Sequence, residues 1–173
     1  SRLDNKKMSW KISEFSPKEL LKGCIDMLSI EAKQREQNLC ISSEDSDIPN
    51  IIGDKERIEQ VIINIVQNAM KYTPEKGSIE TGIFYKYFTS VKGLKDGNYI
   101  LIKVKDNGVG IPEEDIPHLF ERFYRVEKAR SSETGGTGLG LSIANEIVLA
   151  HNGVINVEST LGEGTTIYIY IPS

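Results

Sequence analysis

The chain has 173 residues, enough for one α/β domain with its own core, and its 39% hydrophobic and 27% charged residues are ordinary for a soluble domain. Acids and bases are mixed along the chain and give a net charge of −4, so charge offers no reason to expect a nucleic-acid partner. The sequence contains no apolar run of about 20 residues and no signal peptide, which argues against a membrane-spanning segment.

The first eight residues, 1–8, have the pattern of a frayed helix end. We interpret them as the remnant of an upstream helix in a longer protein, with residues 9–173 forming the folded domain. A processed terminus or a cloning scar is the alternative.

The N-terminal third predicts a strand, a helix and a second strand. An edge strand is expected up to Phe15, and Ser16 is expected to cap a helix that ends near Arg35. A short strand at 39–41 and a polar loop at 43–50 follow. The apolar stripe of the helix is expected to be Leu20, Leu21, Cys24, Met27 and Leu28. Both cysteines, Cys24 and Cys40, are expected to be buried thiols.

A second helix is predicted after the cap Asp54, because apolar residues recur at helical spacing until Thr73-Pro74. Strands are expected at 78–88 and 98–105, a short helix at 112–119 and a third helix at 139–151. The Ser/Glu/Gly-rich stretch 126–137 is expected to be a loop, and strands 153–158 and 165–171 close the chain. This order favours one mixed sheet with helices on one face.

The second helix carries Asn64, Asn68 and Lys71 on the side away from its apolar stripe. Asn is a poor residue for a helix interior, so two on one face invite a functional reason. Amide oxygens together with phosphate oxygens suit Mg²⁺. A solvated polar face is the alternative, and it is the commoner case for such residues taken alone.

Asp106 follows an alternating strand and precedes Asn107-Gly108-Val109-Gly110. Its carboxylate could accept a hydrogen bond from the amine of adenine, while glycines allow close approach to a flat ring. A hairpin turn is the alternative reading of Asn-Gly. A helix rather than a returning strand begins after Pro112, which weakens that alternative.

The glycine-rich segment 135–141 opens the third helix, and such a helix N-terminus favours an anion. A plain flexible linker is the alternative, but it does not explain the immediate start of an amphipathic helix. Arg122 and Arg125 lie before the loop, and either could reach phosphate. We favour a solvated role for Arg122 and a functional role for Arg125.

These segments, in this order, resemble the catalytic and ATP-binding domain of bacterial sensor histidine kinases, within the superfamily that includes gyrase, heat-shock-chaperone and mismatch-repair ATPases. The resemblance covers about Trp10 to Pro172. Residues 64–74 resemble the N box, 106–110 and 136–141 the two glycine boxes, 119–125 the F box and 162–165 the last glycine motif.

The resemblance implies an α+β fold: a two-layer α/β sandwich whose mixed sheet of about five strands is covered on one face by three helices, with an ATP lid at 126–137. It implies Asn64, Asn68 and Arg125 as catalytic residues and Asn68 as the Mg²⁺ ligand. The implied ATP-binding set is Asn64, Asn68, Lys71, Tyr72, Asp106, Gly108, Gly110, Ile111, Arg125, Gly136, Thr137, Gly138, Leu139, Gly140, Leu141 and Thr165.

The implied activity is transfer of the γ-phosphoryl group of Mg–ATP to a histidine outside this chain. His118 is expected at the surface and His151, partly cationic, at a helix C-terminus, so neither fits the acceptor. The implied partners are the phosphoacceptor helical hairpin and, through the parent protein, a response regulator. The fragment is expected to be a monomeric cytoplasmic domain of a membrane-anchored parent.

Two alternatives remain at this stage: an ATP hydrolase of the same superfamily and a non-catalytic nucleotide-binding module. The hydrolase branches carry Glu where Asn64 stands, and an amide cannot act as the general base that activates water. No residue of the sequence degrades the expected pocket, which argues against the non-catalytic module.

Overall fold

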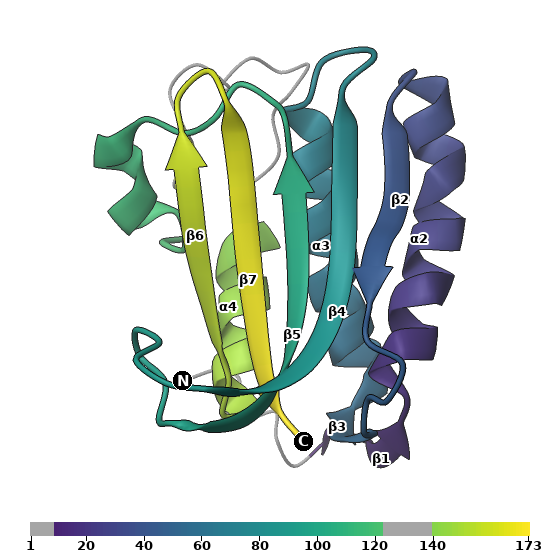
Figure 1. The fold of residues 1–173 in the computed structure, drawn as a ribbon, viewed down its shortest axis with the longest axis vertical. Coiled ribbons are helices and arrows are strands. Elements are labelled where there is room, and N and C mark those ends of the chain that lie inside the picture. The colour runs from purple at the N-terminus through teal and green to yellow at the C-terminus, as the bar shows by residue number, and fades with distance from the viewer. Residues whose placement is uncertain (1–8, 123–139) are drawn as a thin grey trace.

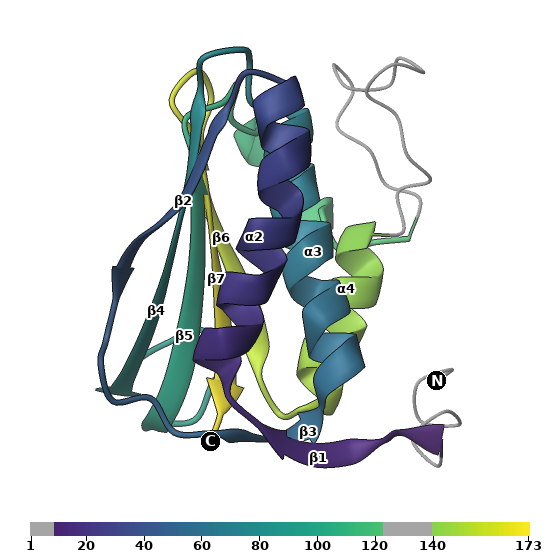
Figure 2. The same ribbon diagram turned by 90° about the vertical axis from the view of Figure 1, so that its right-hand side faces the viewer.

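The computed structural model of this protein describes residues 9–122 and 140–173. Its main sheet has five strands in the order β2 (Asn38–Glu44), β4 (Ser78–Phe88), β5 (Gly97–Asp106), β7 (Gly164–Pro172) and β6 (Val154–Thr160). β2 pairs with β4 in parallel, and the other pairs are antiparallel. Three helices, α2 (Pro17–Gln34), α3 (Lys55–Lys71) and α4 (Gly140–Ala150), cover one face of this sheet (Figure 1, Figure 2). The predicted two-layer α+β fold is therefore confirmed.

Helix α2 begins as predicted, because the Ser16 hydroxyl accepts a hydrogen bond from the Glu19 N–H at 3.2 Å. The predicted apolar stripe contains one error: Met27 is 52% exposed, whereas Ile25 is buried. Met27 is three residues from Cys24 but lies just beyond the edge of the buried arc. At this edge the helical period of 3.6 residues decides which face a residue occupies.

Helix α3 is capped at its start by Asp54, whose Oδ1 accepts from the Arg57 N–H at 3.3 Å. Its buried face is Ile58, Val61, Ile62, Ile65, Val66, Ala69 and Met70. Two carbonyls near its C-terminus are bonded by side chains: Met70 O accepts from Gln37 Nε2 at 2.8 Å, and Ala69 O accepts from the Thr73 hydroxyl at 2.7 Å. Helix α3 lies between α2 and α4 in the helical layer, and its buried face packs in the core (Figure 2).

A two-stranded sheet of β1 (Ile12–Phe15) and β3 (Ile51–Asp54) lies at the N-terminal ends of α2 and α3 (Figure 2). The sequence predicted β1 but missed β3. Four residues are too short to show a period of two, and β3 runs directly into the cap of α3. The pair places Phe15 opposite Ile51, and both side chains are buried.

The remaining boundaries are close to the predicted ones, with the short helix formed as a 3-10 turn at Glu113–His118. β2 extends to Glu44, into the predicted loop, and β6 and β7 are each longer by one or two residues at the shared turn. Cys24 is buried as expected, but Cys40 is exposed. β2 is an edge strand, and Cys40 points away from the side that Leu39 and Ile41 pack against the core.

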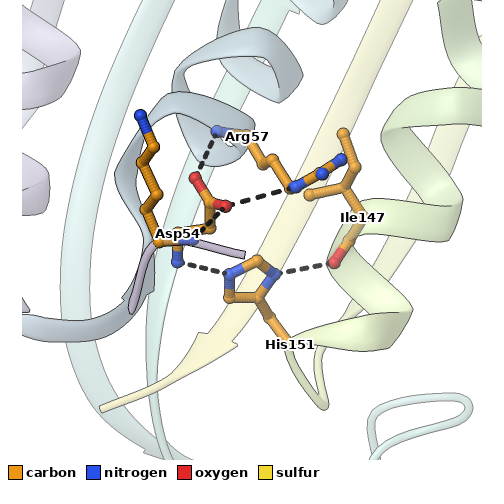
Figure 3. A network of polar contacts seen from close by, with 5 residues as sticks. Asp54, Arg57, Ile147 and His151 are labelled. Atoms are coloured by element: carbon orange, nitrogen blue, oxygen red, sulfur yellow. Dashed lines mark hydrogen bonds and ion pairs between the residues drawn. The ribbon is translucent and has the colours of Figure 1, made fainter. Parts of the chain in front are cut away.

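His151 lies at the C-terminal end of α4, as expected, but its ring is buried and accepts a backbone hydrogen bond, which contradicts the expected partly cationic state. Its two ring nitrogens contact the backbone of Asp54 and Ile147 (Figure 3). No helix in residues 9–122 and 140–173 has the length and apolar character needed to cross a membrane.

Candidate functional site

Three segments far apart in the sequence meet at the end of the sheet where β5 stops and β7 starts: the end of α3, the loop after β5 and the β6–β7 turn (Figure 1). The Val109 N–H donates to Tyr72 O at 3.2 Å, which joins the loop after β5 to the end of α3. The Gly162 N–H donates to Val109 O at 2.7 Å, which joins that loop to the β6–β7 turn. The Asn64 side chain donates to Gly140 O at 3.2 Å, at the start of α4.

Asp106 is the buried acid of this region, with 7% of its surface exposed. Its Oδ1 accepts from the Gly108 N–H at 2.9 Å and from the Thr165 N–H at 3.2 Å. Burial raises the pKa of this carboxyl above its ordinary 3.8, and the two backbone hydrogen bonds act in the opposite direction. Within the described ranges no hydrogen-bond donor contacts Oδ2.

Gly108 and Gly110 are needed for the loop after Asp106 to pack closely. A Cβ at Gly108 would lie 2.3 Å from Tyr72 O, and one at Gly110 would lie 2.3 Å from Thr160 O. Gly110 also has a φ of +76°, which side chains with a Cβ rarely adopt. These glycines therefore hold the loop against α3 and the β6–β7 turn.

The polar residues predicted on α3 lie together on its half-buried face. Asn64, Asn68 and Lys71 occupy successive turns, and Tyr72 caps the helix. The contact of Asn64 with Gly140 brings this face to the end of the second glycine segment. Asn64 uses its Nδ2 atom in that contact, so its amide oxygen remains an acceptor.

Thr165 and Ile111 are tied to the strands beside Asp106 by different contacts. Thr165 is directly opposite Asp106 in the β5–β7 register and is buried. The Ile111 N–H donates to the hydroxyl of Ser159 at 2.8 Å, which fixes the chain after Gly110. Leu141, the second residue of α4, is half-buried against the core.

Several predicted site residues lie outside the described residues: Arg125, Gly136, Thr137, Gly138 and Leu139, together with the predicted lid at 126–137. Of the described members, Tyr72, Asp106, Gly108, Gly110 and Thr165 lie at one end of the sheet, whereas Asn64 contacts Gly140 partway along the helical layer.

The residues present fit a nucleotide with Mg²⁺ better than a metal held by protein alone. Residues 9–122 and 140–173 contain no group of three His, Cys, Asp or Glu side chains placed to hold a metal. Amide oxygens on α3 are hard ligands that would complete a shell made mostly of phosphate oxygens and water. The acceptor Oδ2 of Asp106 fits an amine, as adenine carries.

Sequence reasoning missed Ser159 and Gln37. The predicted strand ended at Glu158, two residues too early, so Ser159 was not recognised as a partner of Thr165. Gln37 supports the end of α3 from a separate segment, and no local pattern indicates that contact.

The two-layer fold and the glycine loop after Asp106 are those of an ATP-binding domain. The chain belongs to the family of histidine kinase-, DNA gyrase B- and HSP90-like ATPases, whose sequence profile matches residues 53–173.

The sensor histidine kinase WalK of Bacillus subtilis is 45% identical over 119 residues, which are 69% of this chain and 18% of that protein. WalK of Staphylococcus saprophyticus is 46% identical over 119 residues, again 69% of this chain and 18% of that protein. The chain thus spans about a fifth of the length of the curated relatives it matches.

Among solved structures, the catalytic domain of histidine kinase ThkA matches with a TM-score of 0.73 and 28% identity, covering 94% of this chain and 95% of that one. ThkA in complex with the response regulator TrrA matches with a TM-score of 0.72 and 26% identity, covering 93% of this chain and 41% of that one. These structural matches extend the likeness in fold to the part of the chain before residue 53.

Proposed function

We propose that this domain binds Mg–ATP at the end of the sheet marked by Asp106 and supplies the γ-phosphoryl group to a histidine on a separate helical domain of its parent protein. The observation that carries the proposal is the fixed carboxylate of Asp106. Two backbone N–H groups hold Oδ1, at 2.9 and 3.2 Å, and leave Oδ2 as an acceptor.

An acceptor fixed in this way suits adenine, because the exocyclic amine of adenine donates a hydrogen bond. Guanine carries a carbonyl oxygen at the same position, which an ionised carboxylate repels. Tyr72, whose carbonyl accepts from the Val109 N–H, and Ile111, which follows the same loop, would contact the base.

The phosphates would then extend along α3. Asn68 would hold Mg²⁺ through its amide oxygen, and Asn64 and Lys71 would contact the ion or the phosphates. Mg²⁺, when bound, offsets the negative charge of the triphosphate. Gly140 and Leu141 start the helix whose N-terminus would face the phosphates, and Arg125 and residues 136–139 complete the proposed set.

The amide at Asn64 supports phosphoryl transfer over hydrolysis, because an amide cannot take a proton from water as a general base does. The two histidines of the chain do not fit the acceptor. His118 is paired with Glu121 at 2.7 Å on the surface, and His151 is buried with both ring nitrogens bonded. We therefore place the acceptor on the phosphoacceptor hairpin of the parent.

The relatives support the wider setting of this proposal. WalK is named a sensor kinase, and ThkA has been solved with a response regulator. We infer that the parent of this domain is a sensor kinase that passes its phosphoryl group to a response regulator in the cytoplasm. The parent would be anchored in the membrane.

Radiolabelled Mg–ATP tests the transfer. Incubated with this chain alone, it should leave no label on protein; with the parent's phosphoacceptor hairpin added, the hairpin should become labelled. A hairpin with its histidine replaced is the control and should stay unlabelled. Label on this chain itself, or rapid phosphate release without labelling, would contradict the proposal.

A further inference from the structure

Three polar residues form a row across adjacent strands at the candidate base pocket. Asp106 on β5 is opposite Thr165 on β7, and Thr165 is opposite Ser159 on β6. The row continues the face of the sheet that carries the core residues Ile167 and Val104. Ser159 therefore acts on the pocket only through its contact with Thr165. It is not in the set implied by the sequence motifs.

The hydroxyl of Ser159 has three described partners. It accepts from the Ile111 N–H at 2.8 Å, contacts Gly164 O at 3.0 Å and contacts the Thr165 hydroxyl at 2.8 Å. A carbonyl oxygen only accepts, so the single proton of Ser159 belongs to the bond with Gly164 O. If that proton pointed to Thr165 instead, two oxygens would face each other at 3.0 Å without a proton between them.

The direction of the Thr165 hydroxyl follows from this assignment. Ser159 has its proton in the bond to Gly164 O, so in the bond at 2.8 Å Thr165 is the donor. Ser159 is the only described partner of that hydroxyl. The Thr165 proton is thus turned away from Asp106, and only oxygen lone pairs of Thr165 remain for a ligand.

We propose that Ser159 is a positioning residue that makes the base pocket an acceptor-only surface and so selects adenine over guanine. The inference rests on the proposed function, since it assumes that a purine nucleotide binds beside Asp106. With the proton of Thr165 held by Ser159, Asp106 and Thr165 both present acceptors. These match the amine of adenine and oppose the carbonyl of guanine.

Removing the Ser159 hydroxyl has a specific consequence. In Ser159→Ala the Thr165 hydroxyl can rotate and donate to the guanine carbonyl, while Asp106 continues to disfavour it. The preference for ATP over GTP should fall about tenfold, the effect of one hydrogen bond in a binding site. A purely structural role for Ser159 would weaken both nucleotides alike and leave their ratio unchanged.

The test is calorimetric titration of the whole chain with Mg²⁺ and non-hydrolysable analogues of ATP and GTP. Ser159→Ala should lower the ratio of affinities, and Ser159→Thr, which keeps the hydroxyl, should retain it. Adding Thr165→Val to Ser159→Ala removes the rotated donor and should abolish the gain in GTP binding. Ser29→Ala removes a helix hydroxyl bonded to Ile25 O at 2.7 Å and is the matched control with no change.

The outcomes separate this inference from the proposed function. If the unaltered chain binds neither analogue, the proposed function fails. If it prefers the ATP analogue and Ser159→Ala keeps the same ratio, the proposed function stands and the role of Ser159 is overturned. If Ser159→Ala does not fold, Ser159→Cys is tested in its place. A thiol is of similar size but hydrogen-bonds weakly, so this variant should also lower the ratio of ATP-analogue to GTP-analogue affinity.

Discussion

His151 accepts a hydrogen bond from the backbone N–H of Asp54, with 3.1 Å between its Nε2 and the amide nitrogen (Figure 3). Its Nδ1 lies 2.8 Å from Ile147 O, which can only accept, so Nδ1 carries the proton and the ring is neutral. Trp10 stacks on the ring with 4.8 Å between centroids. The imidazole of His151 therefore connects the end of α4 with the cap of α3 and with Trp10, which precedes β1.

Replacing this ring should destabilise the domain. His151→Ala leaves the Asp54 N–H without its buried acceptor and opens a cavity under Trp10, at a cost of about 2–4 kcal/mol in the free energy of unfolding. Urea unfolding followed by the fluorescence of Trp10, the only tryptophan, measures the change. His118→Ala, on an exposed ring, is the matched control and should change stability by less than about 0.5 kcal/mol. Equal effects of the two variants would refute the importance of the contact.

Two glycine substitutions should act in opposite directions. A Cβ at Gly53 would lie 2.7 Å from Cδ2 of His151, so Gly53→Ala must displace the ring and should lower stability by about 1–3 kcal/mol. A Cβ at Gly23, inside α2, meets nothing within 4 Å, and Gly23→Ala should raise stability by up to about 1 kcal/mol. Thermal unfolding of both variants checks the signs. A loss of stability in Gly23→Ala would contradict the open surroundings assigned to it.

Asp106→Asn should weaken ATP binding without lowering the free energy of unfolding. The amide keeps an oxygen for the Gly108 and Thr165 N–H groups but turns an N–H donor toward the adenine amine, so ATP affinity should fall at least about tenfold. Stability should be unchanged or higher, because the variant no longer buries a charge. Calorimetry and urea unfolding on the same samples measure the two effects. Parallel losses in both would mean that the carboxylate acts mainly in folding.

The raised pKa of Asp106 predicts opposite pH responses for stability and binding. Burial favours the protonated acid, so the stability contribution of this group is fully present below the ordinary pKa of 3.8 and is lost as pH rises through the raised folded value. ATP affinity should instead fall as pH decreases through that folded value, since a protonated carboxyl accepts less well. Titrations over the acidic range should show this decline, and Asp106→Asn should lack it.

The two cysteines should differ sharply in reactivity. Cys40 is exposed on the edge strand β2, whereas Cys24 is buried in α2. Burial, with a smaller contribution from Glu59, raises the pKa of the Cys24 thiol to about 11, so very little thiolate forms at neutral pH. A thiol reagent should label one cysteine quickly in the folded protein and both in urea. Cys40→Ser should remove the fast phase, and Cys24→Ser should leave it intact.

Local patterns in the sequence determined the fold class and much of the candidate site. Helix α3 was recognisable because seven buried residues repeat at helical spacing, and Asp106 because it ends an alternating strand before two glycines. The order of the short motifs then predicted the family. Each of these signals lies within a few residues along the chain, where periodicity and turn chemistry act directly.

Other features were decided only by the tertiary structure. The bond between Asp54 and His151 joins residues 97 positions apart, and the row from Ser159 to Asp106 depends on the register of three strands. The exposure of Met27 and Cys40 depends on which neighbour covers each face. Sequence periodicity reports which side of an element is apolar, but it does not report which distant backbone group will meet a given hydroxyl or imidazole. That choice is made when the strands and helices pack, and here it sets both the neutral ring of His151 and the direction of the Thr165 hydroxyl.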